Sequence, residues 1–289
     1  MATLLKGAAV VKALNEESTG AVERLKQKGI IPTLAIVRVG EREDDIAYER
    51  GATKRCEKVG VSVRQVTLAR DCSEAELIAT LEQLNTDATI HGVLLFRPLP
   101  AQMDDNRVRN TLAPEKDIDG ITDLSLAGVF TGTDTGFAPC TAQACMEILD
   151  FYGIDPKGKR AVVIGRSLVV GKPAALMLIA KHATVTVCHT RTVDMPAVCR
   201  EGEILIVSAG RAGIVGADYL AAGQIVIDVG INVADDGSLM GDVDFAAAEP
   251  IVEAITPVPG GVGTVTTSVL VKHVVQAALR NAAATGIEI

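Results

Sequence analysis

A turn between a strand and a helix contains the first residues that could do chemistry. The segment 162–173 is VVIGRSLVVGKP, in which an apolar strand ends at Gly165 and a helix begins near Gly171. Glycine at a strand end lets the backbone approach a pyrophosphate, and a helix N-terminus supplies N–H donors. We expect Gly165, Ser167 and Gly171 to bind a dinucleotide. The G-x-x-x-x-x-G spacing departs from the usual G-x-G-x-x-G, so a purely structural turn is the alternative.

The residues after the next strand indicate which dinucleotide would bind. Sites specific for NAD usually place an acidic residue there to bind the ribose 2′-hydroxyl. This sequence has His189, Thr190 and Arg191 instead, and Arg166 adds a second cation in the preceding turn. Arginine and threonine suit a 2′-phosphate, so the pattern favours NADP over NAD. The alternative is that both arginines are only solvated.

Strands and helices that alternate along the chain must position these residues. The first half has helical patterns over 7–28 and 44–58 and from Ser73, between strands at 33–39, from Ser62 and at 91–96. The second half has strands at 161–164, 184–188, 204–208 and 224–229, and a final helix over about 265–283. This alternation predicts an α/β fold of open, largely parallel sheets, with a domain boundary near residues 145–160.

The composition bounds the class of protein. Hydrophobic residues make up 48% and charged residues 22% of the 289-residue chain, an ordinary globular balance. The net charge of −8 argues against non-specific binding to nucleic acid. The six cysteines are scattered without a C-x-x-C pair, so we expect reduced thiols and no metal site. We see no signal peptide in Met1–Glu17 and no apolar stretch of about 18 residues, which favours a cytoplasmic protein without a membrane span.

Six short segments together resemble the methylenetetrahydrofolate dehydrogenase/methenyltetrahydrofolate cyclohydrolase family. They are PEKDIDGI (114–121), FAPCT (137–141), VVIGRSLVVGKP (162–173), VIDVGIN (226–232), GDV (241–243) and ITPVPGGVG (255–263). The resemblance implies a folate-binding domain from residues 1–145 plus 265–289 and a Rossmann-like NADP-binding domain from residues 146–264. It implies that the C-terminal helix packs back on the first domain, that the active site lies between the domains and that the protein is a homodimer. The implied reaction is hydride transfer from 5,10-methylenetetrahydrofolate to NADP.

The resemblance also implies roles for individual residues. Asp119 matches the family aspartate that anchors the pterin, where a carboxylate accepts from the exocyclic amine and an adjacent ring N–H. Tyr48 matches the tyrosine that packs on the aromatic middle of folate, and we assign both residues to catalysis and to substrate binding. Without the family, Asp119 would fit a turn and Tyr48 would fit partial burial against the sheet. The resemblance further implies substrate contacts from Pro259, Gly260 and Gly261 and a cofactor contact from Ile231, whereas Cys140 is expected to have no catalytic role.

The sequence departs from the family where the hydrolytic step is performed. Bifunctional members carry a lysine four residues after the tyrosine, and this chain has Ala52 there. The glutamine that bonds this lysine in the family is replaced by Phe96. Lys54 lies about 120° around the helix from Tyr48, and Arg55 lies too far along the axis and is a poor proton shuttle, so rescue by either is not expected. We therefore predict a dehydrogenase that has lost cyclohydrolase activity.

Three alternatives and one residue stay open at this stage. The chain could be a bifunctional enzyme with weak cyclohydrolase activity, an inactive protein that binds folate or NADP, or a different Rossmann-type dehydrogenase. Asp45 stands where the family usually has a serine. It could make a new polar contact, but a solvated helix position is the favoured interpretation.

Overall fold

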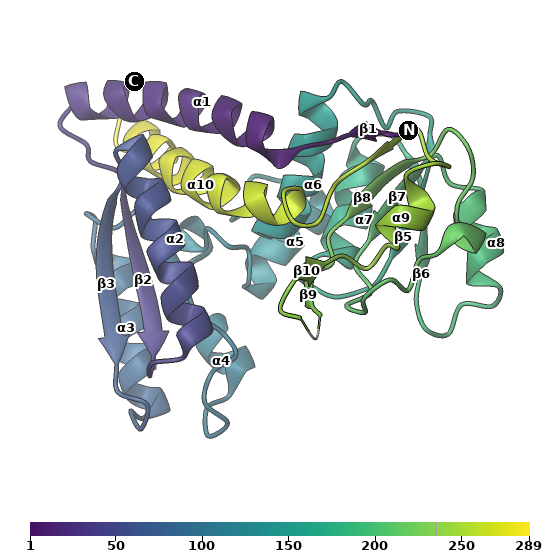
Figure 1. Cartoon of the computed structure of the whole chain (residues 1–289). Coiled ribbons are helices and arrows are strands. Elements are labelled where there is room, and N and C mark those ends of the chain that lie inside the picture. The colour runs from purple at the N-terminus through teal and green to yellow at the C-terminus, as the bar shows by residue number, and fades with distance from the viewer. Residues whose placement is uncertain (235) are drawn as a thin grey trace. The chain divides into compact units, whose positions relative to one another are not determined.

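The computed structural model describes residues 1–234 and 236–289 (Figure 1). The chain forms two compact units. One, the six-stranded unit, consists of Met1–Lys12 and Thr141–Thr266; the other, the three-stranded unit, consists of Ala13–Cys140 and Thr267–Ile289.

The three-stranded unit is built on a small parallel sheet. Its strands β2 (Thr33–Val39), β3 (Ser62–Leu68) and β4 (Gly92–Leu95) lie in the order β3-β2-β4. Helix α2 (Glu43–Val59) connects β2 to β3, and α3 (Glu74–Thr86) connects β3 to β4. The predicted β-α-β-α-β pattern is confirmed. Each strand matches its predicted range to within one residue where both ends were predicted.

Alternation along β2 explains how both faces of this sheet are covered. Ala35, Val37 and Val39 belong to one buried cluster with side chains of α3. The opposite face includes Arg38, whose Nε donates to Glu49 Oε2 of α2 at 2.9 Å. Because successive side chains of a strand point to opposite faces, one strand can pack on α3 and be tied to α2 at once.

Shorter elements complete this unit around the loop that contains Asp119. They are α4 (Asp105–Arg109), the 3₁₀ helix η1 (Pro114–Lys116), α5 (Asp123–Thr131) and the start of α6 (Cys140–Phe151). Two long helices, α1 (Gly7–Gln27) and α10 (Val262–Ala284), contribute most of their length to this unit. Ser268 of α10 donates to Asn15 of α1 at 3.2 Å, both side chains being buried. The C-terminal helix therefore packs on the first domain as predicted.

Helix α10 is also long and apolar enough to span a bilayer by length and composition alone. Of its most apolar 18-residue window, 61% is buried inside the protein. This degree of burial is typical of the core helix of a globular protein.

The six-stranded unit is an open sheet whose strands all run parallel. The order is β1-β11-β8-β7-β5-β6. The strands are β1 (Thr3–Leu4), β5 (Arg160–Ile164), β6 (Thr184–Cys188), β7 (Ile204–Val207), β8 (Ile225–Asp228) and β11 (Ala254–Ile255). This unit also contains most of α6, together with α7 (Gly171–Ala180), α8 (Met195–Arg200), η2 (Ala217–Tyr219), α9 (Phe245–Ala248) and a hairpin of β9 (Asn232–Val233) and β10 (Leu239–Met240).

The N-terminus differs from the sequence-based division of the chain. Thr3 and Leu4 pair with Ala254 and Ile255, so β1 extends the six-stranded sheet, and residues 1–12 cluster with that unit. The sequence division had placed residues 1–145 together. A two-residue strand is too short to produce a periodic signal, so only its pairing reveals it.

Candidate active site

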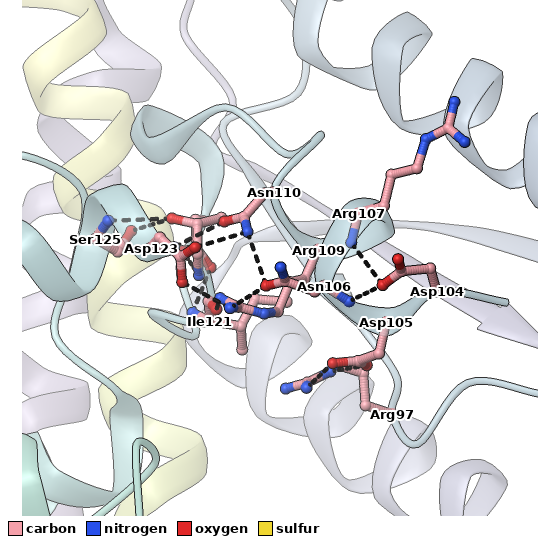
Figure 2. A network of polar contacts seen from close by, with 12 residues as sticks. Arg97, Asp104, Asp105, Asn106, Arg107, Arg109, Asn110, Ile121, Asp123 and Ser125 are labelled. Atoms are coloured by element: carbon pink, nitrogen blue, oxygen red, sulfur yellow. Dashed lines mark hydrogen bonds and ion pairs between the residues drawn. The ribbon is translucent and has the colours of Figure 1, made fainter.

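A buried carboxylate organises the loop that presents Asp119. The Asp117 side chain is fully buried, and it accepts from the backbone N–H groups of Ile121 at 3.0 Å and Thr122 at 2.8 Å. Arg109 of α4 donates to the carbonyl of Ile121 at 2.6 Å and bonds Asp123 at 2.6 Å (Figure 2). In the segment DIDGI, the first aspartate therefore folds the loop and leaves the second aspartate, Asp119, available to a ligand.

Asp119 lies in a surrounding that resists its ionisation. Burial raises the pKa of the Asp119 carboxyl to about 6, and the charge of Asp117 adds to this effect. Hydrogen bonds from the thiol and backbone of Cys140 and the positive charge of Arg97 lower the pKa in part. At neutral pH the carboxylate is ionised and can accept two hydrogen bonds from a ligand, as the sequence assignment requires.

Tyr48 lies on α2 beside the same carboxylate. The residue is 37% exposed, and its ring meets the ring of Phe96 edge-on, with centroids 5.7 Å apart and an interplanar angle of 85°. Burial of its hydroxyl and the negative charge of Asp119 raise the pKa of Tyr48, and a hydrogen bond with Thr267 opposes this rise. Tyr48 is therefore a neutral aromatic surface, suited to packing against a planar ligand.

The expected position of a hydrolytic lysine is occupied by a methyl group. Ala52 is completely buried in the face of α2 that also contains Glu49 and Cys56. Lys54 is exposed, and Arg55 is partly exposed. The chain thus brings together Tyr48 and Phe96 at this place, with a buried Ala52 one turn along the helix.

The favoured interpretation of Asp45 as a solvated residue is wrong. Asp45 is only 7% exposed, on the buried face of α2, and its Oδ2 lies 3.9 Å from Arg42 Nε. Asp45, Glu49 and Ala52 recur with the helical period and form one buried face of α2. Two of the three are acidic, so the sequence does not show this face as an apolar stripe.

Two polar groups near Asp119 were missed by sequence reasoning. Arg97 is held by Asp105 of α4 through Nε and Nη2 (Figure 2). His273 of α10 is buried, with Nδ1 2.8 Å from the carbonyl of Ile118 and 3.6 Å from the Cys140 sulfur. Burial lowers the pKa of His273 to about 4. An arginine directly after a predicted strand was a usable signal for the first group, whereas the second depends on a contact between distant segments.

In the six-stranded unit, the glycine turn lies where the strand order changes direction. Strand β5 is followed by β6 on one side and by β7 on the other, and ligands of open parallel sheets bind at such switch points. Gly165 follows β5 directly with φ +116°, and a Cβ there would lie 2.3 Å from the carbonyl oxygen of Ser208. A Cβ on Gly171 would lie 2.2 Å from the Gly165 carbonyl oxygen. Glycine is required at both positions by the close approach of backbone to backbone.

The polar residues assigned to the cofactor surround this turn. Ser167 Oγ accepts from the backbone N–H of Val170 at 3.1 Å, which shapes the start of α7. Arg166, Thr190 and Arg191 are exposed, the last two just after β6. Two exposed cations and a close-packed glycine turn at a switch point fit a dinucleotide with a 2′-phosphate.

Ile231 and the Pro259–Gly261 segment form a second part of this unit's site. They line a pocket of about 220 Å³ with Asp228, Leu239 and neighbouring residues of both loops. Ile231 is 62% exposed, and a Cβ on Gly263 would lie 3.0 Å from its Cδ1. The backbone N–H of Gly7 donates to the Gly260 carbonyl at 2.8 Å, which anchors the glycine loop.

Two buried carboxylates missed by sequence reasoning hold these loops. Asp228 accepts from the backbone N–H groups of Gly230, Asp242 and Val243 at 2.9 to 3.1 Å, and burial raises its pKa to about 6. Asp242 accepts from the backbone of Gly210 at 2.8 Å and Arg211 at 3.0 Å. The segments VIDVGIN and GDV therefore shape the site through two aspartates whose side chains are buried and bind backbone N–H groups.

These features define a two-unit α/β protein with a dinucleotide site in one unit and a carboxylate–tyrosine site in the other. A model of the catalytic domain of the tetrahydrofolate dehydrogenase/cyclohydrolase family matches residues 5–119, and a model of its NAD(P)-binding domain matches residues 139–282. The chain therefore belongs to this family, and the predicted resemblance is confirmed.

Individual relatives match over nearly the whole chain. Bifunctional protein FolD of Carboxydothermus hydrogenoformans is 50% identical over 279 residues, covering 96% of this chain and 97% of the relative. The structure of bifunctional FolD from Campylobacter jejuni has a TM-score of 0.94 at 37% identity and covers 97% and 99% of the two chains. The Trypanosoma brucei enzyme, solved with NADP and an inhibitor, has a TM-score of 0.90 at 34% identity and covers 96% and 98%.

Proposed function

We propose that this protein is an NADP-dependent methylenetetrahydrofolate dehydrogenase without cyclohydrolase activity. It oxidises 5,10-methylenetetrahydrofolate to 5,10-methenyltetrahydrofolate. The observation that supports the loss is the pairing of a fully buried Ala52 with the Phe96 ring against Tyr48. The dehydrogenase residues Asp119, Tyr48, Gly165 and Gly171 are all retained.

The retained residues suffice for hydride transfer because this reaction mainly requires position and orientation. Asp119 accepts from the 2-amino group and ring N–H of the pterin and so fixes its plane. Tyr48 packs against the aromatic middle of the folate. The Pro259–Gly261 loop and Ile231 border the nicotinamide. When bound, NADP accepts the hydride from the methylene carbon.

The retained residues do not suffice for hydrolysis of the methenyl product. That step needs a group that activates water or manages the proton of the substrate. A methyl group can do neither, and the phenyl ring of Phe96 neither donates nor accepts a conventional hydrogen bond. The hydroxyl of Tyr48 is a poor base because its pKa is raised, which keeps it protonated.

A bifunctional enzyme with weak hydrolytic activity is the second candidate. Its support is that the relative from Carboxydothermus hydrogenoformans, at 50% identity, is named bifunctional. The two candidates differ only in the fate of the methenyl product.

Separate assays of the two half-reactions test the proposal. Purified protein is given methylenetetrahydrofolate with NADP or NAD, and cofactor reduction is followed; it is then given methenyltetrahydrofolate alone, and decay is followed. We expect reduction of NADP and a lower kcat/KM with NAD. Methenyltetrahydrofolate should decay at the same rate with the protein as in buffer alone. Accelerated decay would establish the bifunctional candidate. Binding of folate and NADP without reduction would indicate an inactive binding protein.

The homodimer is part of the same proposal. Strand β6 is the edge of the six-stranded sheet, and Val187 on it is 39% exposed, with Val193 beyond it 88% exposed. An unpaired edge with exposed apolar side chains suits contact with a second copy. Sedimentation equilibrium tests this contact: we expect the mass of a dimer for the wild type and that of a monomer for Val187→Lys. The mass of a dimer for both proteins would place the interface elsewhere.

A further inference from the structure

Arg97 is a cation beside the proposed folate site, and it takes no part in the functions described above. It follows Phe96 directly, and Phe96 contacts Tyr48. Its side chain is 30% exposed, so it is partly accessible to a ligand. The family's lysine is absent from this chain, and Arg97 is a cation close to the place where that lysine would act.

The pair with Asp105 fixes the direction of the guanidinium. Nε donates to Asp105 Oδ1 at 2.6 Å, and Nη2 donates to Oδ2 (Figure 2). This two-point contact holds the plane of the guanidinium. Nη1 makes no hydrogen bond with the described residues, so its two N–H groups remain available as donors.

The same short helix anchors Arg97 and the loop that contains Asp119. Asp105 of α4 binds Arg97, and Arg109 of α4 binds the carbonyl of Ile121 at 2.6 Å. Asp105 and Arg109 are four residues apart, so they lie on one face of α4 about 6 Å apart along its axis. Ile121 is only two residues from Asp119. Arg97 and Asp119 are therefore held as neighbours by a common support, and the Asp119 charge acts on Arg97.

The hydrogen-bonding edge of a pterin requires a donor beside Asp119. Along this edge stand the 2-amino group, the ring N–H and the 4-oxo group, in that order. The carboxylate of Asp119 serves the first two, which are donors. The third is an acceptor, and a carboxylate cannot bind it.

We propose that Arg97 is a substrate-positioning residue whose Nη1 donates to the 4-oxo group of the pterin. The arginine thereby supplies the cationic donor at the pterin edge of this lysine-free site, and Asp105 holds it in place. The assignment rests on the proposed function, since it concerns the same substrate.

Steady-state kinetics of variants at Arg97 and at its partner Asp105 test this role. Arg97→Leu should raise the KM for methylenetetrahydrofolate on the order of tenfold to a hundredfold, the loss expected for one charged hydrogen bond. The KM for NADP should change little. Arg97→Lys should recover part of the loss, and Asp105→Asn should cost less than Arg97→Leu because it keeps the cation and removes only the charge of its anchor. Equal losses in Arg97→Leu and Asp105→Asn would mean that the ion pair is only structural, and would overturn the proposal.

A matched control and a second ligand sharpen this test. Arg107 lies on the same helix, pairs with Glu74 at 3.3 Å and has a side chain that is 70% exposed, so Arg107→Leu should behave as the wild type. Calorimetric Kd values for tetrahydrofolate and for its 4-amino counterpart measure the preference for the oxo group. This preference should fall in Arg97→Leu and persist in Arg107→Leu. An unchanged preference in folded Arg97→Leu would overturn the proposal even if its KM had changed.

The pH profile measures the effect of the Arg97 charge on Asp119, which a KM alone does not report. The groups that face Asp119 are Asp117, Arg97, Cys140 and Tyr48, and His273 bonds the neighbouring Ile118 carbonyl. Of these, Asp117 and Arg97 are the charged groups, because the thiol and the phenol have raised pKa values and His273 has a lowered one. Removing the positive charge raises the pKa of Asp119, so the acidic limb of kcat/KM should move to higher pH in Arg97→Leu. A limb that stays in place would contradict the assignment, whereas a wild type that never reduces NADP would instead refute the proposed function.

Discussion

The ring of Phe96 stands edge-on to the ring of Tyr48, with 5.7 Å between centroids. Edge-to-face contact places the positive rim of one ring against the negative face of the other, which stabilises the pair beyond its buried area. In bifunctional members of the family the residue at this place is a glutamine, which bonds the catalytic lysine. Here Ala52 and Phe96 occupy these two positions, and both residues are apolar.

Restoring both polar residues should restore hydrolysis, and restoring one should not. In Ala52→Lys alone, the new ammonium would enter a fully buried position, and we expect the free energy of unfolding to fall by about 3 kcal/mol. Ala52→Lys with Phe96→Gln gives the amine a partner, so methenyltetrahydrofolate should decay faster than in buffer. Absorbance decay and chemical denaturation measure the two effects. A double variant that is folded and binds folate but leaves decay at the buffer rate would show that other positions also block hydrolysis.

Substitution of Asp117 should lower stability, whereas substitution of Asp119 should weaken folate binding. Asp117→Ala removes the acceptor of two buried backbone N–H groups, so we expect a loss of about 3 kcal/mol in the free energy of unfolding. Asp119→Asn should raise the KM for folate strongly. Because burial raises the pKa of Asp119 to about 6, its charge opposes folding at neutral pH, and the neutral amide should not lower stability. Urea denaturation with parallel kinetics checks both, and equal destabilisation by the two variants would contradict this division.

A methyl group at Gly171 should disrupt the cofactor turn. Its Cβ would lie 2.2 Å from the Gly165 carbonyl oxygen, so the helix must move away from the strand. We expect Gly171→Ala to weaken NADP binding at least tenfold, measured by calorimetry. Gly20 is the matched control: it lies inside α1, and its Cβ would meet only Arg24 Nη1 at 3.8 Å. Gly20→Ala should keep NADP affinity and gain about 0.5–1 kcal/mol of stability, since alanine favours a helix interior. Similar NADP affinities in the two variants would show that the close approach at Gly171 is not required.

The parts of this site that the sequence predicts are those encoded locally. Gly165 and Gly171 follow from a strand-turn-helix pattern, and the helical pattern predicted from Ser73 begins at that residue, whose Oγ caps the helix by accepting from Glu76 N at 3.1 Å. Ala52 and Phe96 could be found because the resemblance supplied the residues to compare. The edge-on contact between Tyr48 and Phe96 could not be predicted, since the two rings are 48 positions apart in sequence and meet only after the sheet forms.

The residues that sequence reasoning missed act through distant contacts or through burial. Asp242 supports a loop 31 residues away in sequence, and His273 bonds Ile118 across 155 residues. Asp45 belongs to the same group, since its charge suggested solvent and the helix turned it inward. The local sequence pattern indicates which contacts a residue could make. The roles of these three residues depend on which distant segment the fold packs against them.

The preference for NADP should depend on the two exposed arginines of the turn. Arg191→Gln and Arg166→Gln each remove a cation suited to the 2′-phosphate, so we expect the KM for NADP to rise about tenfold or more, with little change for NAD. Arg160 provides the control, because it is an exposed arginine of β5 that pairs with Glu203 at 3.9 Å, and Arg160→Gln should leave both values unchanged. Equal effects on NADP and NAD would show that these arginines contact a part common to both cofactors.

The buried imidazole of His273 should make the protein sensitive to acid. Burial lowers its pKa from 6.5 to about 4, so the folded state opposes protonation more than the unfolded chain does. Its contribution to stability is therefore fully present above pH 6.5 and is lost as the pH falls toward 4. Over that interval it amounts to about 3 kcal/mol relative to a residue that does not titrate.

His273→Asn removes this proton-linked term while keeping a polar side chain. The variant is expected to lose less stability than the wild type between pH 7 and pH 4, when both are unfolded with urea at each pH. Asp119 and Asp228 change stability in the opposite direction over part of this range, but they are common to both proteins and cancel in the difference. His182 is exposed, so His182→Asn should follow the wild-type curve. A constant difference between wild type and His273→Asn across this range would show that the imidazole is not held neutral by the fold.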